Sequence, residues 1–310
     1  MVPEWRMTRI VYFVGVSTAG SRIFSLFPRW MELVGIDARI EGIDLPLGTS
    51  NAAYHELVQR IAGDPQVLGA VITAHKLGVY ASCHDLFEEV DPFVTLCREV
   101  SGISKRDTTL IAHAPDSLAA NATLQAMLGP GYWVRHEADA LCLGAGGAAT
   151  AIALCLLADL GSIASEPRPA AASPRRVVFV DVDPGRLAAL RRVVEAVHAR
   201  ERVEYFCHTS AEENDALLPG LPPGSMVINA TGLGKDRPGS PLGEAAVFPE
   251  DAVVWDLNYR GALPFLAQAR AQGQQRHLQV HDGRLYFLHG WTQTLSVVLQ
   301  TDLARLEWPA

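Results

Sequence analysis

A glycine-rich turn at residues 144–149 is the segment whose residue types and spacing most clearly permit chemistry. An apolar run, ADALCL, leads into the turn GAGGAA, where Gly144 and Gly146 allow a sharp bend and a close approach of the backbone to a pyrophosphate. Small residues after the bend let the next helix pack closely on a sheet and aim its first N–H groups at phosphates. Glycine also serves purely structural turns, so the motif is weighed with its surroundings. The candidates for nucleotide binding are Gly144, Ala145, Gly146, Gly147 and Ala148.

The segments that follow this turn favour a dinucleotide site. An apolar helix pattern comes next, and a second apolar run, RRVVFVDVD, ends in acidic residues. An acid at the end of this strand accepts hydrogen bonds from ribose hydroxyls and repels a 2′-phosphate, so Asp181 predicts NAD in preference to NADP. Asp183 is interpreted instead as the N-cap of the helix that starts at Pro184. Residues 163–174 have loop composition and lengthen the usual spacing between the turn and the acid.

Composition and charge argue against several classes of partner. At 310 residues the chain is long enough for two domains. The net charge of −8 argues against nucleic acid or an anionic membrane as the main partner, and no apolar run reaches the roughly 20 residues that span a bilayer. The five cysteines lack paired spacing, and the sequence contains no CxxC or HExxH pattern. We therefore expect reduced thiols, no metal site, no signal peptide and a cytoplasmic location.

Alternating strand and helix patterns predict an α/β fold. In the N-terminal part, strand patterns at 9–16, 38–45 and 68–75 alternate with helix patterns at 22–35 and 51–63. This order predicts a mostly parallel sheet with helices on both faces. Further along, we predict a helix at 116–128, strands at 202–207, 225–231 and 252–259, and a helical tail from about 277.

Six short motifs, in order along the chain, resemble the shikimate/quinate dehydrogenase family. They are AVITAHK (70–76), APD (114–116), GAGGAA (144–149), NATGLG (229–234), DLNYRGALPFL (256–266) and DGRLYFLHGW (282–291). The resemblance implies a substrate-binding domain made of residues 1–120 and 277–310, and a Rossmann dinucleotide-binding domain at 121–276. It also places a loop near the nicotinamide ribose, which adds Asn229, Thr231 and Gly232 to the cofactor-binding candidates.

The resemblance implies that Lys76 and Asp116 are the catalytic pair. Removing hydride from an alcohol also requires removal of the hydroxyl proton, and a lysine can hold the developing alkoxide or take that proton. A nearby carboxylate would orient the ammonium group. Taken without the resemblance, Lys76 could be a solvated lysine at a strand end, and Asp116 could be a helix N-cap after proline.

The positions that bind the substrate in the family carry different residue types in this sequence. Apolar residues stand where the family has asparagine and threonine, namely Ala70, Ile72, Ala114 and Pro115. A site that lacks these polar groups should hold a polyol acid poorly. Arg22 and His113 are left open as carboxylate ligands, whereas Arg106 is interpreted as a surface charge. The alignment at the family's late glutamine falls on His289 or Gly290. The remaining substrate-binding candidates are Ser21, Ser104, Tyr259, His289 and Gln293.

The sequence thus predicts an NAD-dependent oxidoreductase of the shikimate/quinate dehydrogenase type. Its substrate would be a small carboxylate, either shikimate- or quinate-like or less hydroxylated, and the protein would be a monomer or a homodimer. Two alternatives stay open: a non-catalytic sensor of a nucleotide or metabolite, and a dehydrogenase acting on an imine or a methylene-tetrahydrofolate-type compound.

Overall fold

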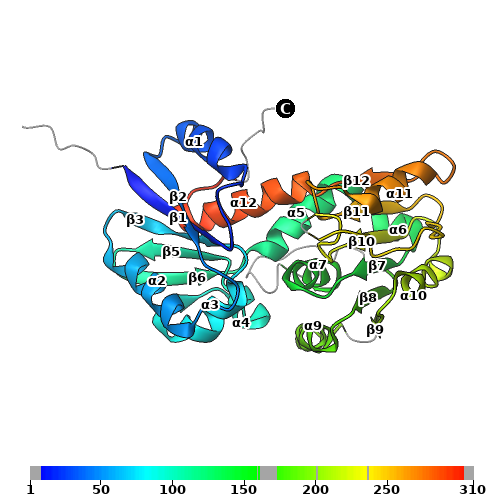
Figure 1. Ribbon diagram of the computed structural model, residues 1–310, viewed down its shortest axis with the longest axis horizontal. Coiled ribbons are helices and arrows are strands. Elements are labelled where there is room, and N and C mark those ends of the chain that lie inside the picture. The colour runs from blue at the N-terminus through cyan, green and yellow to red at the C-terminus, as the bar shows by residue number, and fades with distance from the viewer. Residues whose placement is uncertain (1–7, 159, 161–172, 200–201, 236, 304–310) are drawn as a thin grey trace, which may run out of the picture. The chain divides into compact units, whose positions relative to one another are not determined.

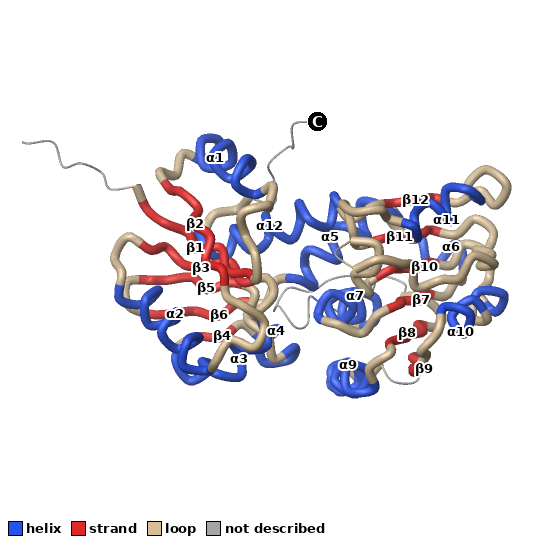
Figure 2. The backbone as a smooth tube through the Cα atoms, in the orientation of Figure 1, coloured by secondary structure: helices blue, strands red, loops and turns tan. Residues whose placement is uncertain are grey.

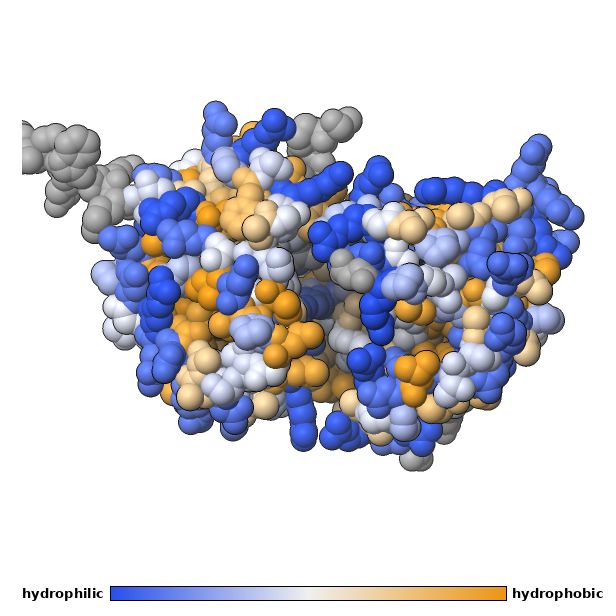
Figure 3. Space-filling view, in the orientation of Figure 1, coloured by the Kyte–Doolittle hydropathy of each residue, from blue (hydrophilic) through white to orange (hydrophobic). Residues whose placement is uncertain are grey.

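The structure is a computed structural model that describes residues 8–158, 160, 173–199, 202–235 and 237–303. The chain divides into two compact units, Met1–Asp116 with Gly290–Ala310, and Ser117–His289. Each unit is built on one six-stranded sheet with helices packed on it (Figures 1 and 2). Hydrophilic residues cover much of the surface of each unit in the face drawn in Figure 3, with smaller hydrophobic patches between them. Within the described ranges, no helix is long and apolar enough to cross a membrane.

The sheet of the first unit has the strand order β2-β1-β3-β5-β6-β4. Strands β2, β1 and β3 are parallel, as the alternating pattern predicts, and β4 is parallel to β6. However, β5 is antiparallel to both β3 and β6, so the sheet is mixed. The turn between β5 and β6 uses Asp107 in a left-handed conformation, with φ of 55°. The strands are β1 Arg9–Gly15, β2 Ala38–Asp44, β3 Val67–Ile72, β4 Glu89–Val90, β5 Gly102–Arg106 and β6 Thr109–His113.

Neighbouring residues of β1 show how helices cover both faces of this sheet. The ring of Phe13 contacts Phe24 of α1 and Trp291 of α12, with centroids 6.0 and 4.9 Å apart. Tyr12 points to the opposite face, where the guanidinium of Arg60 from α2 lies 4.9 Å from its ring. Successive strand residues face opposite ways, so β1 is buried on both sides, as its apolar run indicates. The helices are α1 Ile23–Val34, α2 Asn51–Gly63, α3 Lys76–Cys83, α4 Pro92–Cys97 and α12 Arg284–Leu299.

The second unit has a fully parallel sheet with the order β12-β11-β10-β7-β8-β9. One face packs against α5, α7 and α9, and the other against α11 and the segment around Leu218. The strands are β7 Ala140–Leu143, β8 Val177–Asp181, β9 Val203–Cys207, β10 Met226–Asn229, β11 Val253–Asp256 and β12 Gln279–His281. The helices are α5 Asp116–Leu128, α6 Tyr132–His136, α7 Gly147–Leu157, α9 Pro184–Ala196, α10 Ala211–Asp215 and α11 Pro264–Gln272.

Most of the predicted elements are present, with shifted ends. Helices 51–63 and 116–128 agree with α2 and α5. The predicted strand at 68–75 ends at Ile72, because the chain turns there toward α3. The tail is helical only from Arg284, since residues 279–281 first add an edge strand, which is too short to show a periodic pattern. Of the expected loop at 163–174, only residues 173 and 174 lie within the described residues.

Candidate active site

Lys76 and Asp116 come together in the first unit because two strands end at the same edge of its sheet. β3 and β6 both run antiparallel to the strand between them, β5, and therefore run in the same direction. α3 begins at Lys76 shortly after β3, and α5 begins at Asp116 shortly after β6. Lys76 Nζ donates a hydrogen bond to Asp116 Oδ2, and the two side chains are 20% and 15% exposed. The structure thus forms the predicted pair, in a largely water-excluded position.

A buried histidine fixes the backbone just before Lys76. His75 Nε2 lies 2.9 Å from the carbonyl oxygen of Leu45, and Nδ1 lies 2.8 Å from the hydroxyl of Tyr54. A carbonyl only accepts, so Nε2 carries the proton and Nδ1 accepts from the tyrosine. His75 is 4% exposed. This network anchors the first turn of α3, from which Lys76 projects.

A third ionisable side chain, Glu99, lies beside this pair, and the sequence pattern did not reveal it. Arg98 ends α4 in a left-handed conformation, with φ of 54°, and the backbone N–H of Val100 then bonds to the carbonyl oxygen of Lys76 at 3.1 Å. Glu99 is only 4% exposed. Burial raises its pKa to about 7, although the charge of Lys76 acts in the opposite direction. A glutamate in a loop usually indicates a solvated surface, which is why the sequence alone gave no signal.

The charges of the two carboxylates decide the protonation of Lys76. Burial alone would lower the pKa of this lysine. The charges of Asp116 and Glu99 raise it, as does the hydrogen bond that Lys76 donates to Asp116, and the net effect is a pKa above the ordinary value. Lys76 is therefore an ammonium at neutral pH and can stabilise negative charge that develops on a substrate oxygen.

Two of the predicted substrate ligands in this unit already have partners. Ser104 is 1% exposed, and its Oγ lies 2.8 Å from Nε2 of His113. Nδ1 of His113 lies 3.7 Å from the carboxylate of Asp91, and burial lowers the pKa of this histidine. Ser21 Oγ accepts a hydrogen bond from the N–H of Ile23 at 3.4 Å. The four apolar substitutions, Ala70, Ile72, Ala114 and Pro115, are all buried.

The glycine-rich turn of the second unit bends sharply and leaves open space at Gly146. Gly144 has φ of +110°, and a Cβ there would lie 2.7 Å from the backbone of Ala230. Gly146 is the N-cap of α7, and no atom lies within 4 Å of a Cβ built on it. The N-terminus of α7 thus has open space in front of it, with no side chain from the turn. Both observations fit a dinucleotide pyrophosphate at the start of α7.

Asp181, the predicted ribose ligand at the end of β8, forms a hydrogen bond with the glycine-rich turn. The N–H of Ala145 donates to Asp181 Oδ2 at 2.7 Å, and that of Asp183 donates to Oδ1 at 2.9 Å. Asp183 accepts from the N–H groups of Gly185 and Arg186, which confirms it as the N-cap of α9. Val182, the residue between the two acids, is 65% exposed.

The loop after β10 is held together by its own polar side chains. Asn229 is fully buried; its Oδ1 accepts from Thr231 Oγ1 at 2.7 Å, and its Nδ2 donates to Asp256 at 3.2 Å. Burial raises the pKa of Asp256 to about 6. Gly232 follows with φ of +76° and open space around a built Cβ. Asn229 and Thr231 thus shape the loop, and Gly232 leaves room for a ligand; their contact with a cofactor stays a prediction.

The other predicted substrate residues lie on or near α12. His289 Nδ1 is 2.9 Å from the hydroxyl of Thr123, and burial lowers its pKa. The ring of Tyr259 packs on Phe287 with centroids 4.7 Å apart. Gln293 lies one turn beyond His289 and is half-buried. That these residues bind the substrate stays a prediction.

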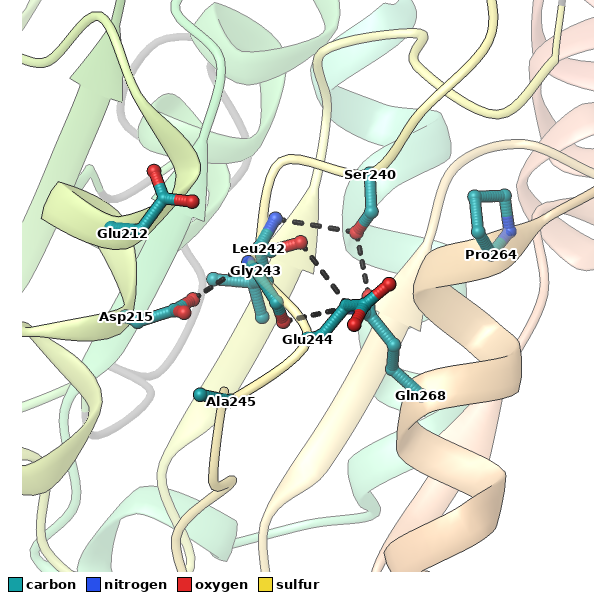
Figure 4. Close-up of a pocket in the computed structure, with 9 residues that line it drawn as sticks. All are labelled: Glu212, Asp215, Ser240, Leu242, Gly243, Glu244, Ala245, Pro264 and Gln268. Atoms are coloured by element: carbon teal, nitrogen blue, oxygen red, sulfur yellow. Dashed lines mark hydrogen bonds between the residues drawn. The ribbon is translucent and has the colours of Figure 1, made fainter.

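A pocket in the second unit is lined by a different set of residues (Figure 4). Some of its polar groups bond to one another: Ser240 to Gln268, Gln268 to the carbonyl of Gly243, and the N–H of Gly243 to Asp215. None of the predicted site residues lines it.

The comparisons with known proteins agree with the motifs. No protein-family model matches the chain. It is 27% identical over 283 residues to a shikimate dehydrogenase (NADP(+)) of Methylobacterium radiotolerans, covering 90% of this chain and 86% of that protein. A quinate dehydrogenase of Corynebacterium glutamicum in complex with NAD is similar in structure, with a TM-score of 0.71 at 20% identity and 95% coverage of both chains. A shikimate 5-dehydrogenase of Listeria monocytogenes, in complex with shikimate and NAD, has a TM-score of 0.70 at 15% identity over 95% and 93% of the two chains.

The resemblance to the shikimate/quinate dehydrogenase family is confirmed. The two-domain α/β fold that this resemblance implies is confirmed as well. The relatives do not favour the two alternatives, a sensor and an imine- or folate-type dehydrogenase.

The two glycines of the turn allow stability and ligand binding to be separated. Gly144→Ala should lower the free energy of unfolding by about 2 kcal/mol or more, because it combines a positive φ with a backbone clash. Gly146→Ala should change it by less than about 0.5 kcal/mol yet weaken NAD binding by ~10-fold, because the methyl group enters the open space. Denaturant unfolding and NAD titration test this. Equal losses of stability in both variants would contradict this geometry.

Proposed function

We propose that the protein is an NAD-dependent dehydrogenase that interconverts a small hydroxy acid and its keto form. The observation that carries this proposal is the buried Lys76–Asp116 pair, formed where two strands of the first unit end. The first unit would hold the substrate, and the second would hold the nucleotide at its glycine-rich turn. The proposal includes a cytoplasmic location, which the five free cysteines support.

The residues of the pair fit the proton chemistry of such a reaction. When bound, the nicotinamide accepts or returns a hydride. The Lys76 ammonium holds the substrate oxygen and stabilises the negative charge that appears on it as its proton leaves. Asp116 accepts a hydrogen bond from this ammonium and so fixes its direction. The positive charge of Lys76 lies at the N-terminus of α3, where the helix dipole disfavours it. A positive charge at that unfavourable end suggests a chemical use rather than a stabilising one.

NAD is proposed in preference to NADP because the end of β8 is acidic. Asp181 and Asp183 flank the exposed Val182. NADP-using members of the family carry an Asn-Arg-Thr pattern at these three positions. Two carboxylates there would repel a 2′-phosphate. The relatives differ in this respect: the Methylobacterium protein is named for NADP(+), whereas the two solved structures contain NAD.

A single arginine should shift this preference. The protein should bind NAD at least ~10-fold more tightly than NADP. Val182→Arg should narrow that gap chiefly by tightening NADP, because the guanidinium would pair with the 2′-phosphate. Val182→Gln, of similar length but uncharged, is the control and should leave the ratio unchanged. Position 182 is preferable to 181, whose carboxylate also holds the glycine-rich turn. Calorimetric titration with both nucleotides measures the ratios, and NADP binding as tight as NAD in the unmodified protein would refute the assignment.

The substrate is proposed to be a carboxylate with fewer hydroxyl groups than shikimate. Four polar ligands of the family pattern are replaced by the buried apolar residues Ala70, Ile72, Ala114 and Pro115. Ser104, which could compensate, is already paired with His113. Each lost neutral hydrogen bond is worth about 0.5–1.5 kcal/mol, so the four together would weaken the binding of a polyol by several kcal/mol.

A panel of hydroxy acids with NAD tests the reaction and the substrate together. Absorbance of the reduced nicotinamide should rise with at least one acid, and kcat/KM for shikimate should be at least ~10²-fold below that of the best acid. Lys76→Met should lower turnover of that acid by ~10²-fold or more while leaving NAD binding unchanged. Efficient turnover at micromolar shikimate would refute the proposed substrate class. Unchanged turnover in Lys76→Met would refute the proposed active site.

A further inference from the structure

The second unit has a cavity of about 440 Å³ at the edge of its sheet where the strands begin. It is lined by Arg175, Arg176, Arg202, Val203, Glu204 and Gly220. The three arginines come directly before β8 and β9, which are parallel neighbours. The glycine-rich turn follows β7 at the opposite edge, so the length of β8, roughly 16 Å, separates it from the cavity. The cavity is therefore distinct from the candidate cofactor site, and its volume lies within the roughly 300–1,000 Å³ of small-molecule sites.

A buried carboxylate fixes two of the arginines. Asp139, just before β7, is fully buried and accepts hydrogen bonds from both guanidinium groups. Arg175 donates from Nε to Oδ1 at 3.0 Å and from Nη2 to Oδ2 at 3.2 Å, and Arg176 donates from Nε to Oδ2 at 3.0 Å. Two positive charges thus surround one negative charge. Because the guanidinium groups are already held in place, a ligand that binds them pays little for ordering these side chains.

Spare donors remain on two of the arginines. The side chain of Arg175 is 62% exposed although one of its edges is bonded to Asp139, and its Nη1 makes no hydrogen bond to the residues that the structure describes. Arg202 donates from Nη1 to the carbonyl oxygen of Pro174 at 3.4 Å, which brings its guanidinium next to the backbone that carries Arg175. Its Nε and Nη2 have no partner within the same described ranges. Two guanidinium groups therefore offer N–H donors to one cavity.

The acid that lines the cavity does not cancel this charge. Glu204 accepts a hydrogen bond from Nη1 of Arg176 at 3.2 Å, so its carboxylate is already paired. The three guanidinium groups outnumber the carboxylates of Glu204 and Asp139 by one. The whole chain, in contrast, has a net charge of −8. A concave, positively charged site on an acidic protein favours a small anion as its ligand.

We propose that this cavity binds a phosphate group, either free or carried on a small metabolite. The planar fork of an arginine matches a phosphate or a carboxylate in two-point geometry. One fork suffices for the two oxygens of a carboxylate, whereas the additional oxygens of a phosphate allow it to accept from Arg175 and Arg202 together. Gly220 adds no side chain to the wall, and no atom lies within 4 Å of a Cβ built on it, which leaves space beside the phosphate.

Calorimetric titrations of the full chain with inorganic phosphate, glycerol 3-phosphate and glycerol test the proposal. Excess NAD is present throughout to compete for the glycine-rich turn, and sodium chloride keeps the ionic strength constant. Both phosphate compounds should bind, and glycerol should not. Tighter binding of glycerol 3-phosphate would identify a phosphorylated metabolite as the source, and equal or weaker binding would identify free phosphate. If neither phosphate compound bound at millimolar concentrations, the proposal would be overturned.

Replacing one arginine locates the binding. Arg202→Gln should weaken the binding of the tighter phosphate compound by ~10-fold or more, because charge-assisted hydrogen bonds are lost. Arg270→Gln is the matched control, since Arg270 is an exposed arginine of α11 that does not line the cavity, and it should leave the affinity unchanged. Arg175 is kept, because its loss would leave buried Asp139 poorly compensated. Unchanged affinity in Arg202→Gln, or an equal loss in Arg270→Gln, would overturn the proposal.

Two further variants should change the affinity in opposite directions. Glu204→Gln should tighten phosphate binding, because it removes a negative charge from the wall of the cavity. Gly220→Asp should weaken it, because the new carboxylate enters the open space. Thermal melts confirm that each variant folds. If the arginines served only to neutralise buried Asp139, neither variant would alter phosphate affinity, and that result would overturn the proposal. None of these measurements uses turnover, so their outcome is independent of the proposed dehydrogenase activity.

Discussion

The candidate active site depends on one antiparallel strand. β5 runs against its neighbours β3 and β6, so the C-terminal ends of those two strands and the N-terminal end of β5 share one edge of the sheet. Lys76, Asp116 and Glu99 enter the site from these three chain segments. A fully parallel sheet would carry the start of β5 to the opposite edge and separate Glu99 from the pair. The β5–β6 hairpin therefore matters more to the chemistry than any helix packed on the sheet.

In the second unit, backbone conformation rather than side-chain charge shapes the candidate cofactor site. Its parallel strands all end at one edge, and the turn after β7 uses positive φ at Gly144 to pass under the backbone of residue 230. Asp181 then holds the turn through the N–H of Ala145. The same carboxylate that is proposed to contact the ribose thus also fixes the glycine-rich turn. This coupling would link cofactor choice to the shape of the turn.

Local sequence predicted the parts of this structure that depend on nearby residues. The cap at Asp183, the helix that starts at Asp116 and the glycine-rich turn all follow from short patterns, and they are present. The antiparallel β5–β6 pair and the burial of Glu99 depend on contacts between distant segments, such as the bond between Val100 and Lys76. Charged residues in a connecting segment look solvated in sequence. For the same reason, the pairing of Ser104 with His113 could not be anticipated.

The central claim is that the Lys76 amine handles the proton of the reacting hydroxyl, and chemical rescue tests it most directly. Lys76→Ala leaves a space next to Asp116 that a small primary amine could enter. With NAD and the best hydroxy acid of the panel, this variant should be nearly inactive. Added methylamine or ethylamine should restore turnover in proportion to amine concentration, while trimethylamine, which is bulkier, should restore less. Full activity of Lys76→Ala without any amine would contradict the account.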